Sequence, residues 1–138
     1  MIPLLDKIKV RIQRGQFARA RQVSFNFNSE GVTYNSWING KPEIDEFIPW
    51  SEIEKIAAFK RDFFAYDLVC IAFETADFVY EINEEMVCWP AFVEGISTHL
   101  PGCLKAGEWY EAVMFPAFKT NLTVLYSREV TSDLRHNV

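Results

Sequence analysis

Few residues of this chain are of types that commonly carry out chemistry. Two histidines, His99 and His136, and three cysteines are present among 138 residues. A catalytic histidine needs a nucleophile or an acceptor within reach, and no serine or cysteine motif flanks His99. The chain also lacks a Gly-x-Ser-x-Gly elbow, a phosphate-binding glycine loop and a dinucleotide-binding fingerprint. We therefore predict that the protein is not an enzyme; an enzyme of unrecognised type is the alternative, with His99 as its candidate residue.

Cys88, His99 and Cys103 form the one group of soft metal ligands that lies close together in the sequence. Their spacing matches no zinc-binding pattern, and a fourth ligand is not evident. Cys70 lies inside an apolar run and is expected to pack in the core. We predict neither a metal nor a cofactor. An odd number of widely spaced cysteines favours reduced thiols and a cytoplasmic location.

Carboxylates are the most distinctive chemical group, because the net charge of −5 is unevenly distributed. Residues 1–21 contain six basic residues and one acidic residue, a net charge of +5. The remaining residues contain eight basic and 18 acidic ones, a net charge of −10, and residues 62–104 contain no Lys or Arg. A negative field of this kind repels nucleic acid and anionic lipid and attracts a basic partner. We therefore expect no membrane binding and no direct nucleic-acid binding, although the basic residues 1–21 taken alone would suit either.

The acidic residues of this span are the predicted partner-binding site. Adjacent carboxylates such as Glu84 and Glu85 can do acid–base work, but in exposed turns they are usually solvated charges. The functional interpretation is a docking surface for a cationic protein, and the alternative is ordinary solubility. The predicted site consists of Asp67, Glu74, Asp77, Glu81, Glu84 and Glu85.

The elements that would position these residues centre on residues 68–73, which are apolar at every position. Neighbouring residues of a strand point to opposite faces, so both faces of this strand are apolar. A strand of this kind is covered on both sides. We predict that it is the central strand of a sheet.

Apolar and polar residues alternate in several other stretches, as in half-buried strands. These stretches are residues 22–28, 32–38, 43–49, 78–82 and 121–126, and residues 56–64 fit either a strand or a bent connection. Asn39-Gly40 predicts a type I′ hairpin turn. The turn that ends at Gly31 suggests a glycine with positive φ.

One amphipathic helix is predicted over residues 89–101, where Pro101-Gly102 ends it. Its apolar residues recur at helical spacing and form one continuous stripe. The stripe consists of Trp89, Phe92, Val93, Ile96 and Leu100. Residues 108–114 fit a second, shorter helix.

Length and composition indicate one domain over residues 1–138. It comprises a basic N-terminal segment (1–21) that fits a helix or a strand, strands over 22–82, the helix over 89–101 and a polar tail (127–138). No apolar run reaches the roughly 18 residues of a membrane helix, and no secretory signal is expected. The predicted fold class is α+β. We expect an antiparallel, strongly twisted sheet of about five to seven strands, packed by an amphipathic helix in the C-terminal half.

Two short stretches resemble small bacterial PH-like (pleckstrin-homology-like) domains. They are Glu-Gly-Val at residues 30–32 and Ile-Pro-Trp-Ser-Glu-Ile-Glu-Lys-Ile at residues 48–56. In those domains a Gly-Val hairpin and a Trp-x-x-Ile corner precede a paired strand set and a closing helix. The resemblance covers about residues 23–101 and implies a module that binds a small ligand or a lipid-linked partner. Lipid-binding members carry Lys and Arg around the first hairpin turn, but residues 28–31 here contain none, so phosphoinositide binding is not expected.

In size and charge the chain also resembles the immunity proteins encoded beside secreted bacterial toxins. This likeness implies a cytoplasmic, non-catalytic protein that binds and neutralises a basic toxin, often a nuclease, through an acidic surface. That is the function we predict. The PH-like binding module is the first alternative and the unrecognised enzyme the second, and the oligomeric state stays open.

Overall fold

The computed structural model describes residues 21–62, 66–117 and 119–128. The predictions for the basic segment before Arg21 and for the tail after Arg128 lie outside these residues. The described elements are β1 (Arg21–Phe27), β2 (Gly31–Ile38), β3 (Lys41–Pro49), the 3-10 turn η1 (Trp50–Glu52), β4 (Lys55–Asp62), β5 (Asp67–Glu74), β6 (Val79–Asn83), α2 (Trp89–His99), α3 (Ala106–Met114) and β7 (Thr123–Ser127).

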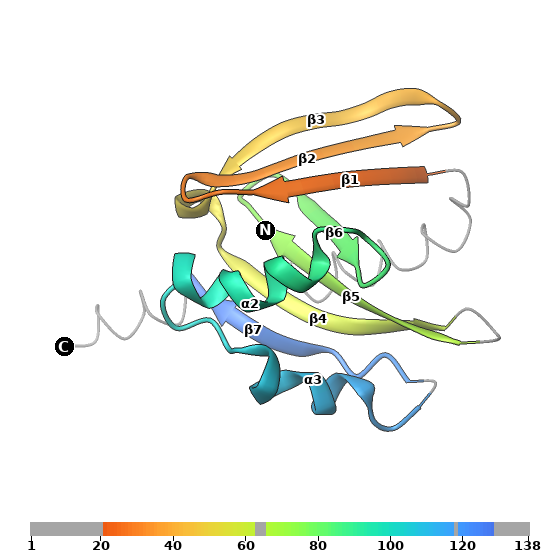
Figure 1. Cartoon of the computed structure of the whole chain (residues 1–138), viewed down its shortest axis with the longest axis vertical. Coiled ribbons are helices and arrows are strands. Elements are labelled where there is room, and N and C mark those ends of the chain that lie inside the picture. Colours follow the sequence, from red (N-terminus) through yellow and green to blue (C-terminus); the bar gives the residue numbers. More distant parts are fainter. Residues whose placement is uncertain (1–20, 63–65, 118, 129–138) are drawn as a thin grey trace.

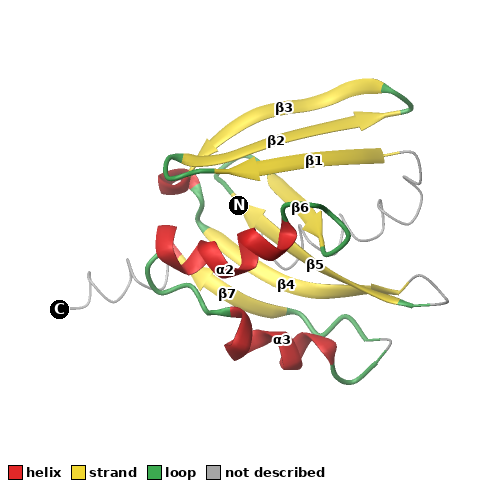
Figure 2. Ribbon diagram, in the orientation of Figure 1, coloured by secondary structure: helices red, strands yellow, loops and turns green. Residues whose placement is uncertain are grey.

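The seven strands form two antiparallel sheets, one in the order β1-β2-β3 and one in the order β6-β5-β4-β7. Helix α2 lies between the two sheets at one side, and α3 lies next to β7 (Figure 1). Among the described residues, α2 and α3 both lie between β6 and β7 in the chain, and Figure 2 shows them in red together with the short η1 turn. The α+β class with antiparallel strands and a packing helix is therefore confirmed, and the strands divide between two sheets.

Strand β5 lies inside the four-stranded sheet, hydrogen-bonded to β4 on one side and to β6 on the other. Both of its faces are buried, as the apolar run predicted. Val69, Ile71 and Phe73 join the main core between the sheets. Leu68 and Cys70 join a second cluster on the opposite face.

The β2–β3 hairpin turn has positive φ at both central residues, 52° at Asn39 and 76° at Gly40. A type I′ turn requires this combination, so the prediction from Asn39-Gly40 is confirmed. The expectation for Gly31 was wrong, because its φ is not positive. A Cβ atom at Gly31 would lie 2.3 Å from the Ile48 carbonyl oxygen, so close approach of β3 is what requires glycine there.

The apolar stripe of α2 faces the main core. Trp89, Phe92 and Ile96 are buried. The Phe92 ring lies 5.4 Å from the Phe25 ring of β1 and 6.2 Å from the Trp50 ring of η1, measured between centroids. Aromatic pairs at these separations add to the energy of apolar burial. Phe92, in the C-terminal half of the chain, thus contacts two elements of the N-terminal half.

Candidate functional site

The six predicted carboxylates do not form one continuous surface. Asp67 begins β5 and Glu74 ends it, and seven steps of about 3.3 Å separate their backbones by roughly 23 Å. Asp77 lies beyond Glu74 in the turn before β6 and is exposed. Glu74 itself is only 3% exposed. The set therefore divides between the two ends of β5, with Glu81 in β6 between them.

Two of the six carboxylates are already paired with cations of β4. Lys60 Nζ lies 3.1 Å from Asp67 Oδ2, and the two side chains are 1% and 13% exposed. The same ammonium group donates to the Met114 carbonyl at 2.6 Å and to the Pro116 carbonyl at 2.8 Å. Lys60 therefore fixes Asp67 and also binds the carbonyl end of α3.

Arg61 makes the second pair on the other face of the sheet. Its Nε and Nη2 atoms donate to the two carboxylate oxygens of Glu81, at 2.8 and 2.6 Å. Burial acts to lower the pKa of Arg61, but the hydrogen bond and the charge of Glu81 outweigh burial and raise it. This fork geometry is the strongest form of ion pair between side chains, so Glu81 is held in the fold.

The long stretch without Lys or Arg was misleading for a physical reason. Antiparallel pairing of β4 with β5 places Lys60 opposite Val69 and Arg61 opposite Leu68. The two cations that precede the stretch therefore reach acidic residues inside it. Sequence separation did not predict this neutralisation because the strand register was unknown.

Glu84 and Glu85 are brought together with two exposed tyrosines. Glu84 Oε1 accepts the Val69 backbone N–H at 3.1 Å, and Glu84 Oε2 accepts the Tyr110 hydroxyl at 3.2 Å. Tyr66 directly precedes β5 and hydrogen-bonds to Glu85, and this contact raises the pKa of Tyr66. Burial and the neighbouring Glu84 carboxylate raise the pKa of Tyr110. We name these four residues, Tyr66, Glu84, Glu85 and Tyr110, the tyrosine–carboxylate patch.

The patch is accessible, since Tyr66 is 49% exposed and Tyr110 is 36% exposed. Carboxylates accept N–H groups of Lys and Arg, and tyrosine rings attract the same cations over their faces. Tyrosine is also a residue on which binding energy often concentrates. The patch can therefore hold a basic side chain of a partner between acceptor oxygens and aromatic rings.

Neither tyrosine was predicted as a site residue. The sequence contained one indication for Tyr110. Trp109 and Val113 are one helical turn apart and form the buried side of α3, so Tyr110 beside them faces outward. The signal at Tyr66 was its position directly before an acidic strand start. Their approach to Glu84 and Glu85 depends on tertiary packing, which the sequence did not specify.

The described surface as a whole exposes more carboxylates than ammonium groups. Among the described side chains, three Lys residues are exposed, Lys41, Lys105 and Lys119. Eleven carboxylate side chains are exposed in the same part of the chain, Glu30, Glu43, Asp45, Glu46, Glu52, Asp62, Asp77, Glu85, Glu94, Glu108 and Glu111. Such an excess attracts cationic proteins over distances of about one Debye length, roughly 8–10 Å at moderate ionic strength.

His99 packs among aromatic rings. Its ring stacks on Trp50 with centroids 4.9 Å apart and an interplanar angle of 11°, and the Phe27 ring meets it edge-on at 6.0 Å. Burial raises the pKa of the Cys103 thiol to about 12, which leaves little thiolate to act as a nucleophile. Within the described residues, no group of His, Cys, Asp and Glu gathers that could hold a metal ion.

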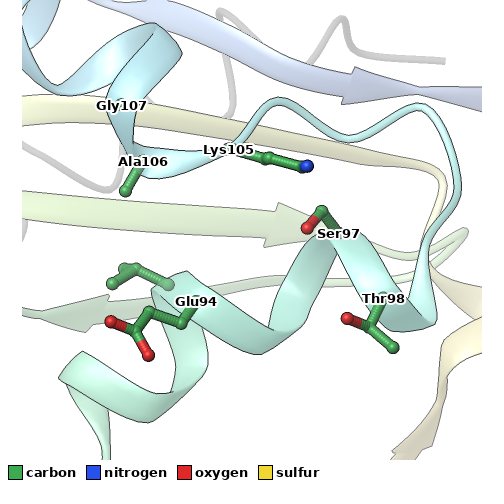
Figure 3. Close-up of a pocket in the computed structure, with 7 residues that line it drawn as sticks. Glu94, Ser97, Thr98, Lys105, Ala106 and Gly107 are labelled. Carbon is green, nitrogen blue, oxygen red and sulfur yellow. The ribbon is translucent and has the colours of Figure 1, made fainter.

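A separate hollow of about 390 Å³ lies between α2 and the start of α3. Glu94, Ser97 and Thr98 line it from α2, and Lys105 lines it from the segment that leads into α3 (Figure 3). Glu108 accepts the Lys105 backbone N–H at 3.0 Å. Two hydroxyl groups and one ammonium group could bind a small polar ligand, but the open walls offer little burial.

Comparison with protein-family models, with curated proteins and with solved structures found no match for this chain. No helix in the part of the chain that the structure describes is long and apolar enough to cross a membrane.

Proposed function

We propose that this protein is a non-catalytic binding protein that docks a basic protein partner on the tyrosine–carboxylate patch. The observation that carries the proposal is the pairing of two exposed tyrosines with two carboxylates on a surface where exposed carboxylates far outnumber exposed ammonium groups. Interfaces favour tyrosine as an anchor, and charge of one sign steers an oppositely charged partner and raises its association rate.

The more specific form of the proposal is a cytoplasmic immunity protein that neutralises a basic bacterial toxin, such as a nuclease. A protein of this kind needs a stable scaffold and a negative docking surface, and it needs no reactive group. The packed aromatic surroundings of His99 and the raised pKa of Cys103 are consistent with such a role.

The test of this function is protection of a bacterial host from a basic toxin domain encoded beside the protein. We expect co-expression of the wild-type protein to restore growth. The variant Tyr66→Ala with Glu85→Lys should lose protection, since it removes one ring and reverses one charge of the patch. Both changes are at exposed positions, so the fold should persist.

The matched control is Glu94→Lys, which reverses one exposed charge on α2. It should protect as well as the wild type, although it changes the net charge by the same amount as Glu85→Lys. Equal loss of protection in both variants would point to overall charge and would remove the patch from the proposal. Absence of protection by the wild type would remove the immunity function.

The second candidate function is a PH-like module for a small ligand, favoured by the hollow between α2 and α3. Among the residues that line this hollow, Lys105 is the one cation. A ligand screen followed by Lys105→Ala would test it. Binding that is lost in Lys105→Ala and kept in Glu85→Lys would favour the module over the protein-docking function.

A further inference from the structure

Strand β3 is an edge strand with a long accessible side. Among the described strands it pairs with β2 alone, and its nine residues span about 27 Å. Six of the nine are exposed. An edge strand presents alternate backbone N–H and C=O groups that have no ladder partner. Long edges of this kind are templates on which another strand can pair.

The other edge strands are shorter. Strand β1 has seven residues and contacts α2 through Phe25 and Phe92. The outer side of β6 has its Glu81 carbonyl occupied by the Tyr34 hydroxyl at 2.9 Å. Strand β7 is only five residues long. The β3 edge is therefore the longest accessible edge that the structure describes.

The regular part of this edge is Ile44–Ile48. A bulge opposite Ser36 and Trp37 interrupts the ladder nearer the hairpin. Beyond it, Ile44, Glu46 and Ile48 point to one face and Asp45 and Phe47 to the other. Phe47 is 46% exposed. An added strand would therefore lie beside both apolar and acidic side chains on each face.

Glu46 of β3 lies towards Tyr80 of β6, because Glu46 pairs with Tyr34 and the Tyr34 and Tyr80 ring centroids are 5.1 Å apart. Glu46 belongs to β3, Glu52 to η1 and Asp77 to the turn between β5 and β6. Together with burial, all three raise the pKa of Tyr80, which places them near one hydroxyl group. The three carboxylates therefore create a local negative potential beside the Glu46 side of the edge.

The charge of the edge decides which occupant fits. A second copy of this chain would bring Asp45 and Glu46 against the same residues, and like charges placed opposite one another destabilise strand pairing. An extended segment that carries Lys or Arg on alternate residues would place its cations beside Glu46, in the negative potential to which Glu52 and Asp77 contribute. Its other side chains would lie beside Asp45 and Phe47.

We propose that the β3 edge binds an extended basic segment of a protein partner by strand addition at residues 44–48. This inference rests on the proposed function only in that the partner is cationic, because its surface lies apart from the tyrosine–carboxylate patch. Backbone hydrogen bonds supply affinity, and the alternate cationic side chains supply specificity.

The probe is a short acetylated peptide of alternating lysine and threonine. Backbone amide exchange is measured by NMR with and without the peptide, and binding is measured by calorimetry at low salt. We expect alternate amides within residues 44–48 to exchange at least about tenfold more slowly when the peptide is bound. A control peptide with the same sequence but N-methylated on every residue keeps the charge and loses all of its backbone N–H donors. This N-methylated peptide should not give the protection.

Two protein variants separate this inference from the proposed function. Asp45→Lys with Glu46→Lys should weaken peptide binding at least about tenfold, and Tyr66→Ala with Glu85→Lys should leave it unchanged. Protection at residues 44–48 that follows this pattern supports the inference. Peptide binding that is lost only in the Tyr66 and Glu85 variant overturns it and supports the patch. Absence of peptide binding also overturns it and leaves toxin neutralisation to its own test.

Discussion

Replacement of Lys60 by methionine tests a deeply buried charge whose partners are defined. The ammonium group uses all three of its donors, on Asp67 Oδ2 at 3.1 Å and on the carbonyls of Met114 and Pro116 at 2.6 and 2.8 Å. Methionine has a similar length and no donor, so Lys60→Met removes these three contacts. The Lys60 side chain is 1% exposed, which gives water little access to replace them.

The expected loss follows from the energetics of buried ion pairs. Removal of one partner of a buried pair costs about 3–5 kcal/mol, out of a total stability of about 5–15 kcal/mol for a domain of ordinary size. A chain of this length should lose roughly 3–4 °C of Tm per kcal/mol. We therefore expect a Tm lower by about 9–20 °C, measured by circular dichroism, and a matching decrease in the urea midpoint.

The double variant Lys60→Met with Asp67→Asn provides the control. It removes the charge that Lys60→Met leaves without its ammonium partner. We expect it to be more stable than Lys60→Met by about 1–2 kcal/mol. A loss below about 1 kcal/mol in Lys60→Met, or a double variant with the summed losses of both single variants, would refute the pairing as the source of stability.

Three further predictions follow from the packing and from the pKa of one thiol. Since the folded pKa of Cys103 is about 12 and its ordinary value is 9.0, its contribution is complete below pH 9 and is lost as the pH rises towards 12. Between pH 8 and pH 10.5, the free energy of unfolding should therefore fall by about 2 kcal/mol more in the wild type than in Cys103→Ala, measured by urea titration. Equal losses would contradict burial of the thiol. Gly31→Ala should lower the free energy of unfolding by about 1–3 kcal/mol, because its Cβ meets the β3 backbone. Gly107→Ala has open space around its Cβ and should raise that free energy by up to about 1 kcal/mol. Equal effects of the two variants in thermal unfolding would contradict this geometry. Phe92→Ala should cost about 3–5 kcal/mol in the same assay, and a loss under about 1 kcal/mol would contradict its central packing.

Much of the secondary structure could be predicted because its signals are local. The Asn39-Gly40 turn, the apolar run of β5 and the stripe of α2 each depend on residues that are neighbours in the chain or one helical turn apart. The division of seven strands into two sheets could not be predicted in this way. Strand pairing depends on contacts between distant segments, such as β4 with β7.

The candidate site was predictable only in part for the same reason. The sequence identified Glu84 and Glu85, which the structure places beside Tyr66 and Tyr110. It also grouped them with Glu81, which the structure pairs with an arginine of β4. Charge counted along the sequence says how much charge is present, but the strand register decides which charges neutralise one another.

The association rate of the protein with a basic toxin domain, measured by stopped-flow fluorescence over a range of salt concentrations, tests the central claim most directly. The patch account predicts that the rate falls steeply with ionic strength and that Tyr66→Ala with Glu85→Lys lowers the low-salt rate at least about tenfold. Glu94→Lys, the control on α2, should change it much less. A rate that is insensitive to salt, or equally reduced in both variants, would contradict docking at the tyrosine–carboxylate patch.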